Sequence, residues 1–88
     1  MQLIRNIAVE HGPDNIRANC ISPGLIKTEF ARALWENEDI LRATTAKSAL
    51  KRIGMPDEIA GAAVYLASEA GSFMTGQNIV IDGGESEQ

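Results

Sequence analysis

The residues most able to do chemistry lie in one segment, from Ser22 to Thr28. There an apolar-rich run ends abruptly in Pro23 and Gly24, and a hydroxyl side chain follows at Thr28. A strand that opens into such a loop leaves backbone amides exposed, and open α/β sheets bind their ligands at strand ends of this kind. The alternative is a plain strand-to-helix turn in which Thr28 caps the next helix. The residue types allow both uses at once.

Several segments must position this loop. Apolar residues at helical spacing predict a helix over residues 1–11, ended by Gly12 as a left-handed cap and by Pro13. This helix begins without a capping residue, which suggests a helix cut in its middle. Residues 16–21 predict a strand that is partly buried on both faces. Residues 28–53 are amphipathic and predict two helical pieces with a break at 37–39.

The second half of the chain repeats the pattern of helix and strand. Residues 56–58, Pro-Asp-Glu, predict a helix start because proline suits the first helical position and carboxylates favour the first turn. Gly71 is predicted to end this helix, residues 78–81 predict a second strand, and residues 83–84 predict a flexible exit. Strands joined through helices form a parallel pair with a right-handed crossover. The fold class is therefore α/β, with two parallel strands, a long helical crossover and three to five helical segments.

Composition and charge exclude several classes of function. The chain has 88 residues and a net charge of −4, and its basic residues are scattered except for Lys47, Lys51 and Arg52. A nucleic-acid surface needs a basic domain or stripe, so we expect no nucleic-acid partner. We find no signal peptide and no apolar run near the roughly 20 residues that span a bilayer. One cysteine suits a reducing compartment, so the expected location is the cytoplasm, without a membrane partner.

The single cysteine and the single histidine are given structural interpretations. Cys20 sits among apolar neighbours and is interpreted as a small buried hydrophobe. His11 falls at a helix end, where the helix dipole favours a surface histidine. No pair of carboxylates has the marks of acid–base work, and no set of His, Cys and Asp has metal-ligand spacing. We therefore expect no metal.

Three segments carry a family resemblance. They are residues 19–28 (Asn-Cys-Ile-Ser-Pro-Gly-Leu-Ile-Lys-Thr), residues 52–60 (Arg-Ile-Gly-Met-Pro-Asp-Glu-Ile-Ala) and residues 75–84 (Thr-Gly-Gln-Asn-Ile-Val-Ile-Asp-Gly-Gly). Together they resemble the C-terminal third of short-chain dehydrogenases/reductases, in the family's order and spacing. A Pro-Gly pair after a strand is a weak signal alone, whereas three matched segments are a strong one. The resemblance identifies residues 1–88 as part of one Rossmann-like, doubly wound domain.

The resemblance implies a cofactor loop. The family moves a hydride between NAD or NADP and a carbonyl or alcohol. Pro23, Gly24, Ile26 and Thr28 match the loop that meets the nicotinamide half of the cofactor. The Ile26 amide and carbonyl can pair with a carboxamide, and the Thr28 hydroxyl can reach a carboxamide or phosphate oxygen.

The resemblance also implies a substrate loop and a subunit contact. Residues 29–50 match the family's variable substrate loop, in which Phe30, Leu34 and Trp35 either line an apolar pocket or pack the hairpin. The helix equivalent to residues 56–68 and the last strand form a subunit contact in the family. Asp82 resembles the family's final Asp-Gly-Gly near that contact.

Departures from the family pattern limit the expected activity. The 88 residues hold no match to the Gly-rich phosphate turn, the Asn-Ala-Gly segment, the catalytic Ser or the Tyr-x-x-x-Lys helix, and Tyr65 is followed four residues later by Glu69 instead of Lys. We therefore assign no catalytic residue and expect an inert fragment that binds no cofactor alone. The alternatives are a non-enzymatic interaction module, present as a homo-oligomer or segment-swapped dimer, and half of an enzyme completed by an N-terminal chain.

Overall fold

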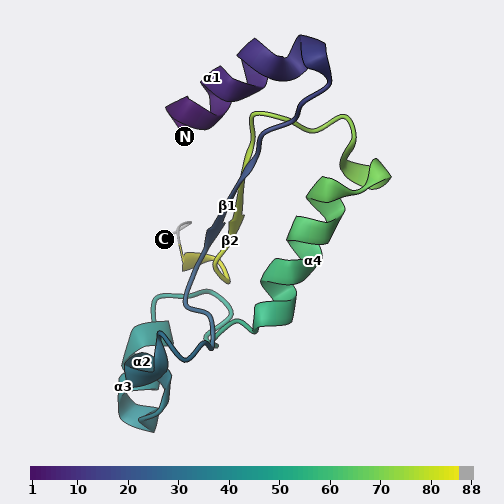
Figure 1. Cartoon of the computed structure of the whole chain (residues 1–88). Helices are drawn as coiled ribbons and strands as arrows, with labels where there is room; N and C mark the ends of the chain where they lie inside the picture. The colour runs from purple at the N-terminus through teal and green to yellow at the C-terminus, as the bar shows by residue number, and fades with distance from the viewer. Residues whose placement is uncertain (86–88) are drawn as a thin grey trace.

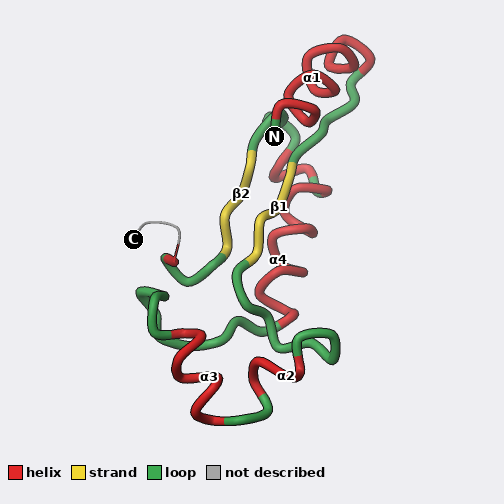
Figure 2. Tube along the Cα trace, turned by 90° about the vertical axis from the view of Figure 1, so that its left-hand side faces the viewer, coloured by secondary structure: helices red, strands yellow, loops and turns green. Residues whose placement is uncertain are grey.

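A computed structural model describes residues 1–85 of the chain. Two strands lie side by side in the middle, α1 lies near their starting ends, and α4 runs alongside them (Figure 1). The α2–α3 hairpin lies beyond the other ends of the strands, as Figure 2 also shows. The elements are α1 (Gln2–His11), the 3-10 turn η1 (Gly12–Asp14), β1 (Cys20–Pro23), α2 (Arg32–Trp35), α3 (Glu38–Thr45), α4 (Pro56–Ala67), the 3-10 turn η2 (Glu69–Gly71) and β2 (Asn78–Ile81).

The two strands pair in parallel, as the sequence predicts. The register places Cys20 opposite Asn78 and Pro23 opposite Ile81. The Cys20 amide donates to the Gln77 carbonyl at 2.8 Å, and the Gly24 amide donates to the Ile81 carbonyl at 2.9 Å. Amides of alternate residues point to the same side of a strand, so the position of Pro23 would donate away from β2. Proline therefore removes no hydrogen bond from this pair.

The first strand is shorter and later than the predicted one, because residues 17–19 bind largely through side chains. The Arg17 guanidinium donates to the Leu66 carbonyl at 2.6 Å and to the Gly71 carbonyl at 2.9 Å. The Asn19 side chain donates to the Met74 carbonyl at 3.0 Å and accepts from the Gln77 amide at 3.1 Å. These contacts cap the end of α4 and fix how the two strands align.

Two predicted helix ends are wrong in detail. Gly12 has an ordinary right-handed conformation with φ −53°, and the left-handed residue is Asn15 with φ 61°. The chain first makes a 3-10 turn through Pro13, and asparagine tolerates the left-handed region that follows. At the other end, α4 stops at Ala67 and Gly71 instead ends η2. A Cβ on Gly71 would lie 2.5 Å from the Tyr65 carbonyl oxygen, so the residue serves a close approach.

The connection between the strands is only partly helical. The two expected pieces are present as α2 and α3, and the Asn37 side chain caps α3 by accepting from the amides of Asp39 at 2.9 Å and Ile40 at 3.2 Å. Residues 46–53, predicted as helical, lie outside any helix. The Leu50 amide there donates to the Gly83 carbonyl at 3.0 Å, so the segment is held by the end of β2 instead.

Apolar side chains are covered poorly in the described chain. Ala8 is the one buried hydrophobic residue within residues 1–85, and Cys20, predicted to be buried, is only half-buried. The accessible surface is 6367 Å², against about 5,000 Å² for a compact protein of this mass. The radius of gyration is 15.6 Å, against about 12 Å for a compact domain of this length. The helices and strands thus lack a shared apolar core. None of the helices within the described residues is both long enough and apolar enough to cross a bilayer.

Candidate functional site

The loop after β1 begins with a close approach between the two strand ends. A Cβ added to Gly24 would lie 2.8 Å from the Asp82 Cα atom, which is closer than real Cβ contacts come. The absence of a side chain at Gly24 thus makes room for the backbone of the neighbouring strand. Gly24 therefore fixes where the loop leaves the sheet.

Ile26 sits in a short parallel bridge opposite Gly54. Its chain neighbours make the bridging hydrogen bonds: the Lys27 amide donates to the Gly54 carbonyl at 2.9 Å, and the Gly54 amide donates to the Leu25 carbonyl at 2.9 Å. In a parallel bridge the central residue directs its own N–H and C=O to the opposite side. The Ile26 amide and carbonyl therefore point away from Gly54, side by side, as a donor and acceptor for another group.

Thr28 ends the loop and starts the turn into α2. Its carbonyl accepts from the Ala31 amide at 3.1 Å, and its hydroxyl oxygen accepts from the same amide at 3.2 Å. The turn interpretation of Thr28 is thus present, although Ala31 is the residue that directly precedes the helix. A hydroxyl that accepts in this way still has a proton to donate. The ligand interpretation is therefore compatible with the turn.

The three candidate substrate-side residues have different surroundings. Phe30 is fully exposed, so it does not pack the hairpin as one interpretation expected, and Leu34 is 43% exposed. Trp35 is half-buried and turned back toward the loop, where its indole N–H donates to the Thr28 carbonyl at 2.8 Å. The Lys27 ammonium lies 5.0 Å from the centre of the Trp35 ring. The structure thus brings the side chain of Trp35, but not that of Phe30, to the loop after β1.

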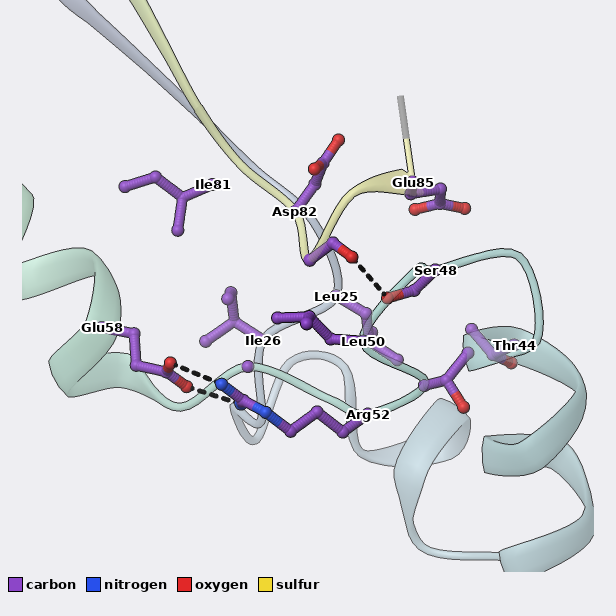
Figure 3. A pocket seen from close by; sticks show the side chains of 13 residues that line it. Leu25, Ile26, Thr44, Ser48, Leu50, Arg52, Glu58, Ile81, Asp82 and Glu85 are labelled. Atoms are coloured by element: carbon purple, nitrogen blue, oxygen red, sulfur yellow. Dashed lines mark hydrogen bonds and ion pairs between the residues drawn. The ribbon is translucent and has the colours of Figure 1, made fainter. Parts of the chain in front are cut away.

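A cavity of about 100 Å³ lies beside the loop and was not foreseen from the sequence. Figure 3 shows its apolar side chains between two polar contacts, the Arg52–Glu58 ion pair and a bond from the Ser48 hydroxyl to the Gly83 carbonyl, 3.0 Å long. The apolar lining residues are Leu25, Ile26, Leu50 and Ile81.

The ion pair of Arg52 and Glu58 holds the segment that faces the loop. Both nitrogens of the guanidinium fork lie 2.9 Å from the two carboxylate oxygens, and the Met55 amide also donates to Glu58 at 2.9 Å. The Arg52 guanidinium, followed by the Met55 amide, lowers the pKa of Glu58 to about 2, and the carboxylate raises the pKa of Arg52. Arg52 and Glu58 lie on either side of Gly54 in the sequence. Their ion pair closes this turn and so supports the position of Gly54 opposite Ile26.

The Asp-Gly-Gly sequence after β2 is a packed turn instead of the predicted flexible exit. The Gly84 amide donates to the Asp82 side chain at 2.9 Å, and Gly83 and Gly84 have φ values of 65° and 90°. A Cβ on Gly84 would lie 2.6 Å from the Ala49 Cβ atom. Both glycines are therefore required by conformation and by contact with the 46–53 segment.

A family model described as enoyl-(acyl carrier protein) reductase matches residues 1–86. One curated relative is a member of the short-chain dehydrogenase/reductase family, and another is a homolog of a reductase. The chain belongs to the short-chain dehydrogenase/reductase family.

Curated relatives cover the chain almost completely. Dehydrogenase/reductase SDR family member 4 of Bos taurus is 44% identical over 82 residues, which are 93% of this chain and 29% of the bovine protein. A tropinone reductase homolog of Arabidopsis thaliana is 41% identical over 83 residues, 94% of this chain and 31% of the plant protein. The chain thus spans about a third of the length of the relatives that it matches.

Solved structures agree in fold. A 4-hydroxyisoleucine dehydrogenase complexed with NADH superimposes with a TM-score of 0.94 at 37% identity, covering 99% of this chain and 36% of that protein. The RhlG/NADP active-site complex of Pseudomonas aeruginosa gives a TM-score of 0.89 at 38% identity, covering 96% of this chain and 34% of that protein. The α/β prediction is confirmed, since the fold corresponds to about a third of a Rossmann-like dehydrogenase.

A metal site needs several His, Cys, Asp or Glu side chains close together. Among residues 1–85, no group of three or more lies close enough together to hold a metal ion. The candidate site consists of the loop residues Pro23, Gly24, Ile26 and Thr28, with Trp35 beside them.

Proposed function

We propose that this short-chain dehydrogenase/reductase chain forms the C-terminal portion of an NAD(P)-dependent oxidoreductase and supplies the loop that meets the nicotinamide. The observation that carries the proposal is the pair of backbone groups of Ile26, which the bridge to Gly54 leaves pointing outward. A primary carboxamide carries one acceptor and one two-proton donor, which such a pair complements. Gly24 and Pro23 shape the approach, and Thr28 adds a hydroxyl.

The bound dinucleotide would supply the hydride, and this chain would bind and orient its nicotinamide end. One similar solved structure is a complex with NADH and another is a complex with NADP, which supports either dinucleotide. The 88 residues contain no Tyr-x-x-x-Lys sequence, and Tyr65 lies on α4 with its ring partly exposed. Since the family uses such a tyrosine to move the proton, the proposal assigns no catalytic residue here. We expect the 88-residue chain alone to bind little cofactor and to turn over no substrate.

The test compares the chain alone with the chain mixed with a second polypeptide. The second polypeptide is the part of the bovine relative that this chain does not match. We expect no change in NADPH or NADH absorbance with a panel of ketones for the chain alone, and turnover in the mixture. Turnover by the purified 88-residue chain would overturn the expected inactivity.

A substitution at Ile26 tests the loop itself. Ile26→Pro removes the outward N–H while both bridging hydrogen bonds, made by Leu25 and Lys27, are retained. Ile26→Val is the matched control because it keeps the N–H and most of the side chain. We expect Ile26→Pro to weaken dinucleotide binding in the mixture about five-fold, as loss of one hydrogen bond does. Equal affinity for both variants would refute the nicotinamide role.

Self-association is a second candidate function, favoured by the outer face of α4. No charged residue occurs between Glu58 and Glu69, and Val64 on the exposed face is 68% exposed. A helix that is apolar all round is normally buried. We propose that α4 and β2 form a contact between two copies of the chain, as a dimer or a segment-swapped dimer. A monomer at micromolar concentration in light scattering would contradict this.

The proposed cellular location of the chain rests on its single cysteine. The single, half-buried Cys20 supports the proposal of a reducing compartment such as the cytoplasm. Fractionation of cells that produce the chain, with a membrane marker and a cytosolic marker, would test it.

A further inference from the structure

Helix α2 is too short to be stable by itself. It contains four residues, and an isolated helix in water needs about 12 residues or more to be even marginally stable. Its ion pairs, from Arg32 to Glu29 at 3.5 Å and to Glu36 at 3.4 Å, join exposed side chains, and such pairs add little. Something else must hold this turn in place.

Beside its packing against α3, helix α2 is tied to residues 27 and 28 by several contacts. The Trp35 indole N–H donates to the Thr28 carbonyl at 2.8 Å, across seven residues of sequence. The Lys27 ammonium lies over the Trp35 ring at 5.0 Å from its centre, within the range of a cation–π interaction. The Thr28 carbonyl and hydroxyl both accept from the Ala31 amide. Residues 28–35 thus form a closed loop with Trp35 as the closing side chain.

We infer that Trp35 is a positioning residue, a latch that fixes α2 to the Thr28 carbonyl so that the hairpin and the cofactor loop move together. The consequence for the cofactor rests on the proposed function: a ligand that bonds the Thr28 hydroxyl also sets the position of α2. The two effects are linked: the factor by which a ligand at Thr28 favours the ordered α2 equals the factor by which ordering of α2 strengthens binding of that ligand. Phe30 and Leu34 make no comparable contact and are carried by the latch.

The experiment measures amide hydrogen exchange in the full 88-residue chain by NMR. The reporter amides are those of Ala31, Leu34 and Glu36, which close the α2 turn. The reference amides are those of Cys20 and Gly24, which bond β2. The variants are Trp35→Phe, which keeps an aromatic ring and loses the N–H, and Lys27→Met, which keeps the aliphatic stem and loses the charge.

The matched controls are Lys27→Arg, which restores the cation over the ring, and Phe30→Ala, which removes a neighbouring, fully exposed aromatic ring. We expect the reporter amides to exchange about five-fold faster in Trp35→Phe, the effect of one hydrogen bond, and about two-fold faster in Lys27→Met. Lys27→Arg and Phe30→Ala should match the unaltered chain. The Trp35 indole proton in the unaltered chain should itself exchange more slowly than in a free tryptophan.

Three results would overturn the latch. They are reporter amides that are unprotected in the unaltered chain, reporter amides unchanged in Trp35→Phe, and equal loosening of reporter and reference amides. Failure of the latch is distinguishable from failure of the proposed function, because the latter is judged by Ile26→Pro, a residue outside the closed loop. A latch that holds while Ile26→Pro has no effect on dinucleotide binding would leave α2 positioning intact and remove its connection to the cofactor.

Discussion

The carboxyl ends of the strands and the outer helix faces differ in what holds them. At the strand ends, backbone groups are paired closely: Gly24 with Ile81, Lys27 with Gly54, and Leu50 with Gly83. On the outer faces of α1 and α4, apolar side chains such as Val9 and Val64 lie in solvent. The strand ends are joined by backbone hydrogen bonds between segments far apart in the sequence, whereas the outer helix faces present apolar side chains that nothing in the described chain covers.

The difference separates shape from stability. A hydrogen bond contributes about 1 kcal/mol net, but it fixes direction and register. Burial of apolar surface is the dominant favourable contribution to folding, at about 25 cal/mol per Å². The chain therefore carries within itself the contacts that shape the Ile26 loop. Covering the exposed apolar side chains on the helix faces would add to its stability.

The largest effect is expected from a substitution in the second region, on the exposed face of α4. Val64→Asp places a charge on the exposed face of α4, where the isolated chain tolerates it but a contact between two copies does not. We expect the assembly to become monomeric in sedimentation velocity. Lys47→Gln is the control, because it changes the net charge by the same amount at an exposed residue outside α4. An assembly that resists Val64→Asp would place the self-contact elsewhere.

A smaller effect is expected from a substitution in the first region, at the carboxyl ends of the strands. Gly24→Ala drives a methyl group to 2.8 Å from the Asp82 backbone, and overpacking of this kind costs about 1–3 kcal/mol. The control is Gly61→Ala on α4, where a Cβ meets nothing within 4 Å. Alanine there should stabilise by about 0.5–1 kcal/mol through helix propensity. Urea unfolding followed by circular dichroism measures both, and opposite signs are expected.

The smallest expected effect is on the pH dependence of stability, through the ion pair of Arg52 and Glu58. The Arg52 guanidinium lowers the pKa of the Glu58 carboxyl to about 2, from 4.5 for the free side chain. The folded pKa is depressed, so the stabilisation is present above pH 4.5 and is lost as pH falls toward 2. Glu58→Gln should remove this part of the pH dependence of the thermal midpoint. Glu36→Gln, which alters a single 3.4 Å contact to Arg32, should keep it.

Elements with local signals could be predicted from the sequence. The strand at residues 78–81 and the helix start at Pro56 appear where they were predicted, because a short apolar run and the residues of a first helical turn are local signals. The first strand could not be placed correctly, because Arg17 and Asn19 bind residues about 50 or more positions away. Such partners leave no trace in a local pattern.

The site shows the same division. Glycine and threonine after a strand marked the loop, but the bridge from Ile26 to Gly54 and the contact of Trp35 with Thr28 are tertiary. One signal was available: Arg52 and Glu58 flank a Gly-Met-Pro segment with opposite charges, which the basic-cluster interpretation of Arg52 overlooked. Their pairing explains why Gly54 sits against the loop.

Pro23 in β1 has a consequence for the free edge of the sheet. Its missing N–H lies on the side that faces away from β2, so a neighbouring strand on that edge finds no donor at this position. A strand added along that edge would lose one hydrogen bond at the end of β1, three residues before the outward amide of Ile26. The free edge of the sheet is therefore least able to pair where it meets the loop.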